Sequence, residues 1–323
     1  DNICYCDGCR EKFCRETGRE IPTTVDWNSQ DWITFQSLRE KWFAEMAEMI
    51  TRTAKSIHPD ITVTQQCSSW ERGWLGAATP RFFIQSDYLA GDFYCGSVEQ
   101  SVICKYLNNM SSNRPIEYMV SRCYTLEQHT TNKPRELLLA QRYSALANHT
   151  AFVFIDAIDP LGTVDYRLYE RMRGIFDEAS PFEHLLDSKS ELLADVAIFL
   201  SQESMRNLSD NGRSVTEVDV HIELIDNAYT IAKTLIEAHI TFDVVSAAQL
   251  DPERYQILIL SDASYLTPKD AEAIRSYVAR GGTVYASKTT SILSDQGLLK
   301  DFALADVFGA HYKGKTEWDE TYL

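Results

Sequence analysis

Residues 151–157 read Ala-Phe-Val-Phe-Ile-Asp-Ala and do most to decide the predicted fold. An apolar run of this length is typical of a strand that is buried on both faces, as in a parallel sheet. A helix rich in Leu and Ala is predicted just before it, over residues 134–148, and another strand over residues 116–122, started by Pro115. Strands and helices alternating at this pace indicate parallel β/α units.

Two further strands are predicted upstream, over residues 61–67 and 84–90. They follow a long amphipathic helix over residues 32–57, which His58 and Pro59 end. The predicted strands match half of an eight-stranded β/α barrel, which we place over residues 1–187. Half a barrel has two open parallel edges, so we expect the other half to come from sequence that precedes Asp1.

The pattern restarts near residue 190 and predicts a second domain over residues 190–323. Buried strands are expected at residues 195–200, 241–245, 256–260 and 283–286, with a helix over residues 222–238. Thr267 is a predicted N-cap with Pro268 in the first helical position, and that helix ends at Gly281. These elements predict a doubly wound, amidotransferase-like open sheet, which we expect to be truncated at its C-terminus. The domain has no Cys nucleophile and no Gly-rich phosphate loop, which favours an assembly role.

Composition excludes some classes of partner. The chain of 323 residues has a formal net charge of -16, which would repel a nucleic-acid backbone or an anionic membrane surface. No apolar run approaches the length of a membrane-spanning helix, about 18 residues or more. All 8 Cys lie in the first 123 residues, several of them in apolar, strand-like surroundings. We therefore expect a reducing compartment, the cytoplasm.

Three thiols stand within the six residues Cys4-Tyr5-Cys6-Asp7-Gly8-Cys9. Thiolates at this spacing can converge on one zinc ion, which takes four ligands in tetrahedral geometry. We expect Cys4, Cys6 and Cys9 to bind a structural zinc, with the fourth ligand from the barrel half that we expect before Asp1 and no organic cofactor. The alternative is that they are ordinary core thiols.

Candidate site residues follow from the rule that a β/α barrel binds its substrate at the carboxyl ends of its strands. Carboxylates with aromatic platforms suit sugar chemistry, in which one acid protonates the leaving oxygen and another attacks or activates water. The carboxylate candidates for catalysis are Glu117 and Asp92. The candidates for substrate binding are Trp70, Arg122, His129 and Asp156.

Each candidate also has a structural interpretation. Glu117 could be a buried carboxylate paired with Arg, and Asp92 could cap a loop. Trp70 could be a packing residue, Asp156 could bridge neighbouring strands, and His129 could be a hydrogen-bonding loop residue. Glu99 and Glu127 are the next carboxylates on the same rim.

The motif from Cys4 to Cys9 resembles the zinc-binding cysteine cluster of the family-42 β-galactosidases. Residues 277–282 and 301–309 resemble the trimerisation domain of that family. Residues 86–94, 115–122 and 154–159 are more similar to a related group of bacterial glycosyl hydrolases described as α-L-fucosidase-like. The resemblance covers nearly the whole chain.

This resemblance implies a retaining, exo-acting glycosidase that acts on fucosides, or alternatively a β-galactosidase, assembled as a trimer or a dimer. One departure stands against the galactosidase, because the family-42 nucleophile position, counted from Pro115, holds Val120. In both families a catalytic carboxylate would fall upstream of Asp1. A non-catalytic carbohydrate-binding or assembly protein is the alternative from a different class.

Overall fold

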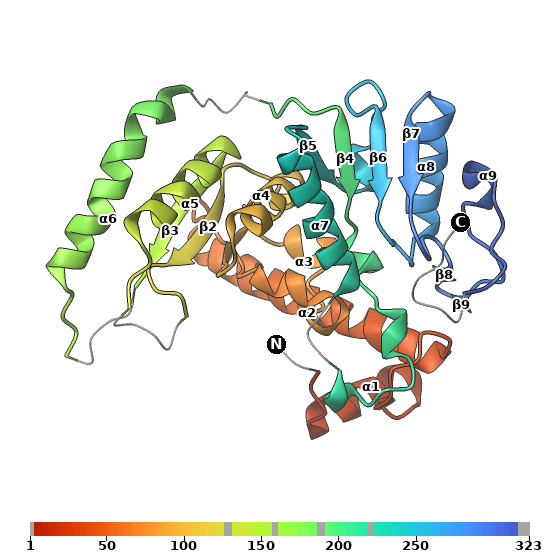
Figure 1. The fold of residues 1–323 in the computed structure, drawn as a ribbon. Helices are drawn as coiled ribbons and strands as arrows, with labels where there is room; N and C mark the ends of the chain where they lie inside the picture. Colours follow the sequence, from red (N-terminus) through yellow and green to blue (C-terminus); the bar gives the residue numbers. More distant parts are fainter. Residues whose placement is uncertain (1–2, 126–130, 157–160, 186–190, 219–221, 316–323) are drawn as a thin grey trace.

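The structure, a computed structural model, describes residues 3–125, 131–156, 161–185, 191–218 and 222–315 (Figure 1). Its first sheet has three parallel strands in the order β1-β2-β3. They are β1 (Ala90–Asp92), β2 (Ile116–Ser121) and β3 (Thr150–Ile155). The connections carry α4 (Ser97–Met110) and α5 (Arg135–Ala147). The predicted alternation of strand and helix is confirmed here.

The register gives this sheet two different faces. Asp92 pairs with Met119, and Met119 with Val153, so these residues share one face with Glu117. Side chains on this face are half-buried. The opposite face is covered by α5 and by α6 (Tyr166–Ala179), whose Phe176 packs on Phe152 and Phe154 of β3. The half-buried face is the one that lines the interior of a β/α barrel.

One predicted strand is absent, and another was wrong in its bounds. Residues 61–67 form no strand and make a single β-bridge, between Gln66 and Ala90. Hydrogen bonds to side chains take the place of strand-to-strand backbone hydrogen bonds there. Val63 donates its N–H to Asp87 Oδ2 (2.7 Å), and Gln65 donates its N–H to Ser86 Oγ (3.1 Å). Residues 84–89 continue the turn that follows α3 (Pro80–Phe83), so β1 begins only at Ala90.

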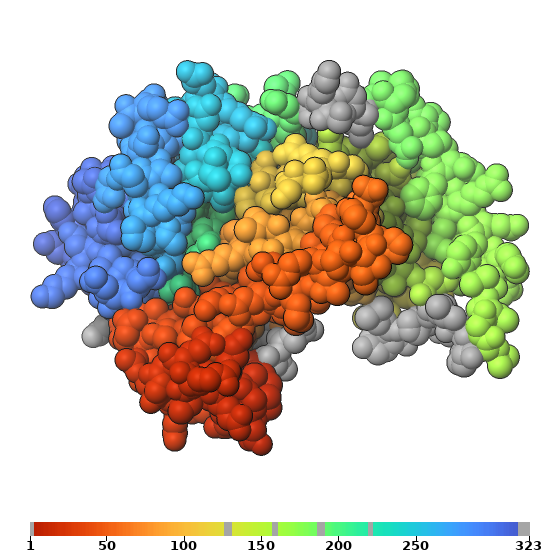
Figure 2. Space-filling model, turned by 180° about the vertical axis from the view of Figure 1, so that it is seen from behind, coloured from red at the N-terminus to blue at the C-terminus, as the bar shows by residue number. Residues whose placement is uncertain are grey.

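The N-terminal helices are α1 (Asp7–Thr17) and α2 (Gln30–Ile57), followed by the 3-10 helix η1 (Ser68–Leu75). Figure 2 shows α2, in orange, lying uncovered across the face turned away in Figure 1. Exposed side chains of α2 include Met46 and Met49. A second 3-10 helix, η2 (Ser180–Leu185), follows α6. Among the described residues no helix, α2 included, combines the length and apolar character needed to cross a membrane.

The second sheet has four parallel strands in the order β5-β4-β6-β7. They are β4 (Val196–Phe199), β5 (Phe242–Val245), β6 (Ile257–Leu260) and β7 (Thr283–Ala286). Its main helices are α7 (Glu223–Glu237) and α8 (Pro268–Ala279). Thr267 caps α8 as predicted, in a capping box with Asp270.

Short elements complete this part of the chain. The remaining 3-10 helices are η3 (Gln202–Ser204), η4 (Leu208–Asp210), η5 (Val215–Glu217) and η6 (Ala247–Gln249). A small antiparallel pair, β8 (Leu293–Ser294) with β9 (Gly297–Leu298), and the helix α9 (Ala305–Phe308) follow β7.

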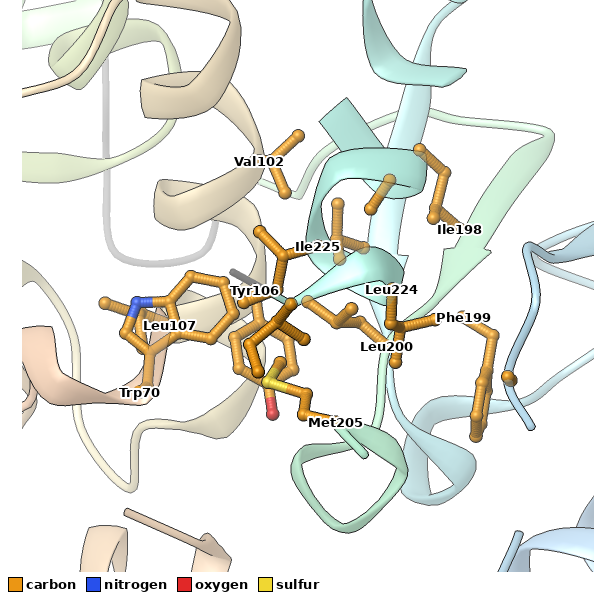
Figure 3. Packing of buried hydrophobic residues seen from close by; sticks show 14 of the residues in the cluster. Trp70, Val102, Tyr106, Leu107, Ile198, Phe199, Leu200, Met205, Leu224 and Ile225 are labelled. Atoms are coloured by element: carbon orange, nitrogen blue, oxygen red, sulfur yellow. The ribbon is translucent and has the colours of Figure 1, made fainter. Parts of the chain in front are cut away.

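One hydrophobic core joins the two sheets. The helix α4 packs against β5 and α7 of the second sheet as well as against β2 and α5 of the first. Figure 3 shows Trp70, Tyr106 and Leu107 meeting Met205, Leu224 and Ile225 across this junction. Burial of this apolar surface fixes η1, and therefore the rim of the first sheet, against the second sheet.

Candidate active site and thiol cluster

Asp92 stands at the carboxyl end of β1 and accepts three hydrogen bonds. Tyr94 Oη donates to Asp92 Oδ2 (2.6 Å), and Ser68 Oγ donates to Oδ1 (3.2 Å). Gln66 Nε2 also donates to Oδ1. Donors on both carboxylate oxygens hold the group in one orientation. This is a pre-organised acceptor on the face that lines a barrel interior.

The backbone around Asp92 explains how these donors converge. Gln66 is placed by its β-bridge to Ala90, and Cys67 N–H donates to Ala90 O (2.9 Å). Gly91 allows the close approach, since a Cβ there would lie 2.7 Å from the Phe93 ring and 3.1 Å from Ser68 N. A larger residue at position 91 would push η1 away from β1.

The Asp92 carboxylate lines a cavity of about 470 Å³. One wall is aromatic, where the rings of Phe43 and Phe82 stack with centroids 4.3 Å apart. The other wall is polar and is formed by Gln65, Gln66, Ser68, Ser69 and Arg72. This volume and this mixture of surfaces fit a small polar molecule with an apolar face, as a sugar ring has.

The Tyr94 phenol stays protonated near neutral pH. Burial raises its pKa, and the hydrogen bond to Asp92 raises it further. The phenol therefore keeps its proton and directs it at Asp92.

Glu117 lies nearer the amino end of the same face. It pairs in register with Ala90, two residues before Asp92 along β1, and Tyr88 Oη donates to its Oε1 (3.1 Å). Burial raises the pKa of Tyr88, and Glu117 adds to that effect. Glu117 thus sits deeper than Asp92, away from the carboxyl ends of the strands.

The structure brings Arg122 and Asp156 together just beyond β2 and β3. Arg122 Nε donates to Asp156 Oδ1 (2.6 Å), and Nη1 donates to Asn132 Oδ1 (2.7 Å). The two charged side chains are only 8% and 11% exposed. A pair so well buried fixes the loops after both strands, and removing either partner would leave a charge without its counterion.

Trp70 lies in the core of the junction. The side chain is completely buried, its ring centroid is 4.9 Å from that of Tyr106, and Gln202 Nε2 donates to the Trp70 carbonyl (2.9 Å) (Figure 3). In this structure its ring faces are covered by protein. His129 lies outside the described residues.

Lys133 is a buried rim residue that the sequence analysis did not single out. It is 3% exposed, and its Nζ has no hydrogen-bond partner among the described residues. Burial lowers its pKa, while Cys95 and Cys123 nearby act in the opposite direction. The sequence alone does not place Lys133 at the rim. The structure does, because Lys133 N donates a hydrogen bond to Arg122 O, just beyond β2.

The thiols of Cys4, Cys6 and Cys9 converge at the N-terminus of α1. Their three Sγ atoms all lie within 4.8 Å of one another. Cys6 is the N-cap of α1, and a backbone hydrogen bond from Cys9 lowers its pKa. Burial raises the pKa of Cys9 to about 12, and hydrogen bonds with the other two thiols add to this. Three thiol groups this close together fit the ligand set of a zinc ion.

Comparison with known proteins identifies structures with a similar architecture. Residues 194–313 match the family model of the β-galactosidase trimerisation domain. The β-galactosidase from Bacillus circulans sp. alkalophilus is similar in structure with a TM-score of 0.73, at 18% identity. The match covers 95% of this chain and 53% of that chain. This chain has the fold of the matching part of that β-galactosidase.

Two further structures are similar to this chain. Alpha-L-fucosidase isoenzyme 2 from Paenibacillus thiaminolyticus is 20% identical with a TM-score of 0.66, over 90% of this chain and 41% of that chain. A catalytic mutant of a GH42 β-galactosidase from G. stearothermophilus is 14% identical with a TM-score of 0.67, over 92% of this chain and 52% of that chain. The chain thus spans about half the length of these structures. No curated protein matches it in sequence.

The expected fold class is therefore confirmed. The first sheet, with its helices, is part of a TIM barrel of the family-42 type, and the β5-β4-β6-β7 sheet belongs to the open-sheet trimerisation domain. By this fold Asp92 faces the barrel interior from the carboxyl end of its strand, where barrel enzymes bind substrate.

Proposed function

We propose that this protein is a glycoside hydrolase and that Asp92 is a carboxylate of its active site. The observation that carries the proposal is the Asp92 cluster: Tyr94, Ser68 and Gln66 aim donors at one carboxylate, on the barrel-interior face, beside a cavity of about 470 Å³. A packing role alone would not need such a group beside a cavity.

The role of Asp92 follows from its donors. Both oxygens already accept hydrogen bonds from the protein, which stabilise the ionised carboxylate and suit a group that attacks or orients the sugar better than one that must give a proton to a leaving oxygen. We assign to Asp92 either the attack on the sugar or the orientation of the sugar. Glu117 is the second candidate for this role on the same face. In a retaining enzyme a partner carboxyl group would stand about 5 to 5.5 Å away.

We propose an α-L-fucoside as substrate, cleaved with retention from the chain end. The fucosidase from Paenibacillus thiaminolyticus supports this through its shared fold. A β-galactoside is the alternative, favoured by the trimerisation-domain match and the Bacillus circulans structure.

A panel of nitrophenyl glycosides, assayed with the full-length protein, separates these activities. Turnover of the α-L-fucoside alone supports the first, and turnover of the β-galactoside alone supports the second. No turnover on any glycoside, together with measurable binding of a sugar, would favour the non-catalytic carbohydrate-binding alternative.

We also propose that Cys4, Cys6 and Cys9 hold a structural zinc ion. Three close thiols support it. A fourth protein ligand would close the site and leave zinc no position for substrate, so the metal would fix the N-terminus of α1 and take no part in hydrolysis.

We propose that the protein is a homo-oligomer, a trimer ahead of a dimer, assembled through residues 194–313. The family model that these residues match supports it. At a net charge of -16, the interface between copies would be apolar or locally charge-paired.

A further inference from the structure

A second cavity, of about 300 Å³, lies where the two sheets meet at the amino ends of their strands. This is the edge opposite to the one that carries Asp92. Its wall combines α4, the start of β2 and β3, and β5 with the residues before β6. The residues that carry the argument are Lys105, Asn108, Arg114, Asn148, Asp243 and Arg254.

Cations gather here in a strongly acidic protein. Lys105, Arg114 and Arg254 all line the cavity, against the carboxylates of Asp243 and Glu191. Burial raises the pKa of the neighbouring Tyr255 and Asp243 adds to the rise, while the charges of Arg254 and Arg114 act against it. The two arginines are placed together by the cavity that both line.

Asp243 is already satisfied by other groups. Its Oδ2 accepts from Tyr255 Oη (2.6 Å), and its Oδ1 accepts from Asn109 Nδ2 (3.0 Å). Arg254 Nη2 lies 3.7 Å from Oδ2, an ion pair beyond hydrogen-bond length. The carboxylate therefore offsets part of the positive charge without occupying the arginine donors.

Lys105 is held rigidly with its charge toward this site. Its Nζ donates to Ser101 Oγ and to Asn148 Oδ1, both at 2.7 Å, and lies 4.8 Å from the centre of the Phe242 ring. Burial lowers its pKa, and the nearby Asp243 counteracts this. An ammonium group has three donors, so one is left for a ligand.

Asn108 has a carbonyl oxygen that accepts no hydrogen bond from the described residues. It is 7% exposed, its Nδ2 donates to Asn148 O and to Thr150 Oγ1 (3.2 Å), and its Oδ1 has no partner among the described residues. A buried carbonyl oxygen in that state is unusual, and a hydroxyl group in the cavity would satisfy it.

We propose that this cavity binds a small polyhydroxylated anion, of which a sugar phosphate is the best fit. Its anionic group would lie between Arg114 and Arg254, because guanidinium groups match phosphate and carboxylate oxygens. Arg114 spends only two donors on the protein among the described residues, at Asn108 O (3.1 Å) and Asn109 Oδ1 (3.4 Å). The ligand's hydroxyl groups would meet Asn108 Oδ1 and Lys105 Nζ. The site joins the two sheets, so its occupation would stabilise their junction.

The test is titration calorimetry on the full-length protein with four probes: glucose 6-phosphate, glucuronate, inorganic phosphate and glucose. Glucose 6-phosphate should bind with a Kd on the order of 0.1 to 1 mM, and added KCl should weaken it. Equal binding of glucuronate would extend the site to sugar acids. Glucose, which lacks a charge, should give no signal. Tighter binding of inorganic phosphate than of both sugar anions would contradict the role of the hydroxyl groups.

Two variants locate the site. Arg254→Gln should weaken glucose 6-phosphate binding about tenfold or more, and Arg114→Gln should do the same. Arg280→Gln is the matched control, because Arg280 is an exposed arginine paired with Asp251 in the same sheet region. Thermal unfolding of each variant checks that it is folded, and Arg254 is exposed enough for its variant to fold if Arg114→Gln does not. Unchanged binding in Arg254→Gln, or no binding of any anion by the unmodified protein, would overturn the proposal.

Discussion

Tyr229 of α7 donates its hydroxyl hydrogen to Glu71 of η1, across the junction between the two sheets. Burial raises the pKa of Glu71, and the Tyr229 hydrogen bond partly offsets that cost. The open-sheet domain therefore helps to hold the rim element that also carries Ser68. This contact joins the rim of the first sheet to a helix of the second sheet.

Replacing Tyr229 by Phe should lower the free energy of unfolding by about 1 to 2 kcal/mol at pH 7, because Glu71 stays buried without its donor. Urea unfolding measures this. Tyr285→Phe is the control, since Tyr285 is 58% exposed on β7. Equal stability of the Tyr229 variant and the unmodified protein would mean that the contact does not hold the rim.

Glu40 of α2 should make stability depend on pH. Burial raises its pKa to about 7, against the effect of Arg206, while Glu203 adds to the rise and Arg39 opposes it. An unfolded Glu ionises near pH 4.3, so the unfolded state releases its proton first as the pH rises. The free energy of unfolding should therefore fall between about pH 4.5 and pH 7.

Glu40→Gln removes this dependence. The variant should match the unmodified protein at pH 4 and exceed it by about 2 kcal/mol at pH 8, measured by urea unfolding at each pH. Glu48→Gln, an exposed residue of the same helix, should change neither value by much. A loss of stability in Glu40→Gln at pH 8 would show that the ionised carboxylate is needed in the fold.

The thiol cluster predicts close to one zinc per chain in protein purified without chelator. Cys6→Ser should lose most of the metal, because it removes one of the three close sulfur ligands. Cys14→Ser should keep it, since Cys14 is a free, exposed thiol outside the cluster. Elemental analysis measures the metal, and less than about 0.2 zinc per chain in the unmodified protein would rule the site out.

Light scattering should give about three times the mass of one chain at micromolar concentration, because residues 194–313 match a trimerisation domain. A dimer mass would favour a twofold contact instead. A clean monomer mass would remove the assembly proposal and leave this domain as a support for the barrel rim.

Local patterns predicted the elements that depend on local physics. The strand predicted at residues 151–157 is β3, over Thr150–Ile155. Thr267 caps α8 because a side-chain acceptor and Pro268 suffice to start a helix. The prediction of a strand at residues 61–67 was wrong because the backbone there donates hydrogen bonds to the side chains of Ser86 and Asp87. No pattern of alternating residues encodes such contacts.

Contacts between distant residues could not be predicted in the same way. Tyr229 and Glu71 are 158 positions apart, and Asn109 meets Asp243 across 134. The residues of the Asp92 cluster were visible as strand-end polar groups, but their convergence depends on Gly91 and on the turn into η1. From the sequence, Trp70 is a candidate ring platform or a packing residue, and only the packing of η1 against α4 and η3 places it in the core.

The central claim, that Asp92 serves a glycosidase active site, is tested most directly by the turnover of nitrophenyl glycosides by Asp92→Asn. We predict that the full-length protein hydrolyses the α-L-fucoside and that Asp92→Asn lowers the rate by about 10² or more without unfolding. Tyr94→Phe should cause a smaller loss, and Asp60→Asn, an exposed position after α2, should cause none. A near-normal rate in Asp92→Asn on the glycoside that the unmodified protein hydrolyses would contradict the claim.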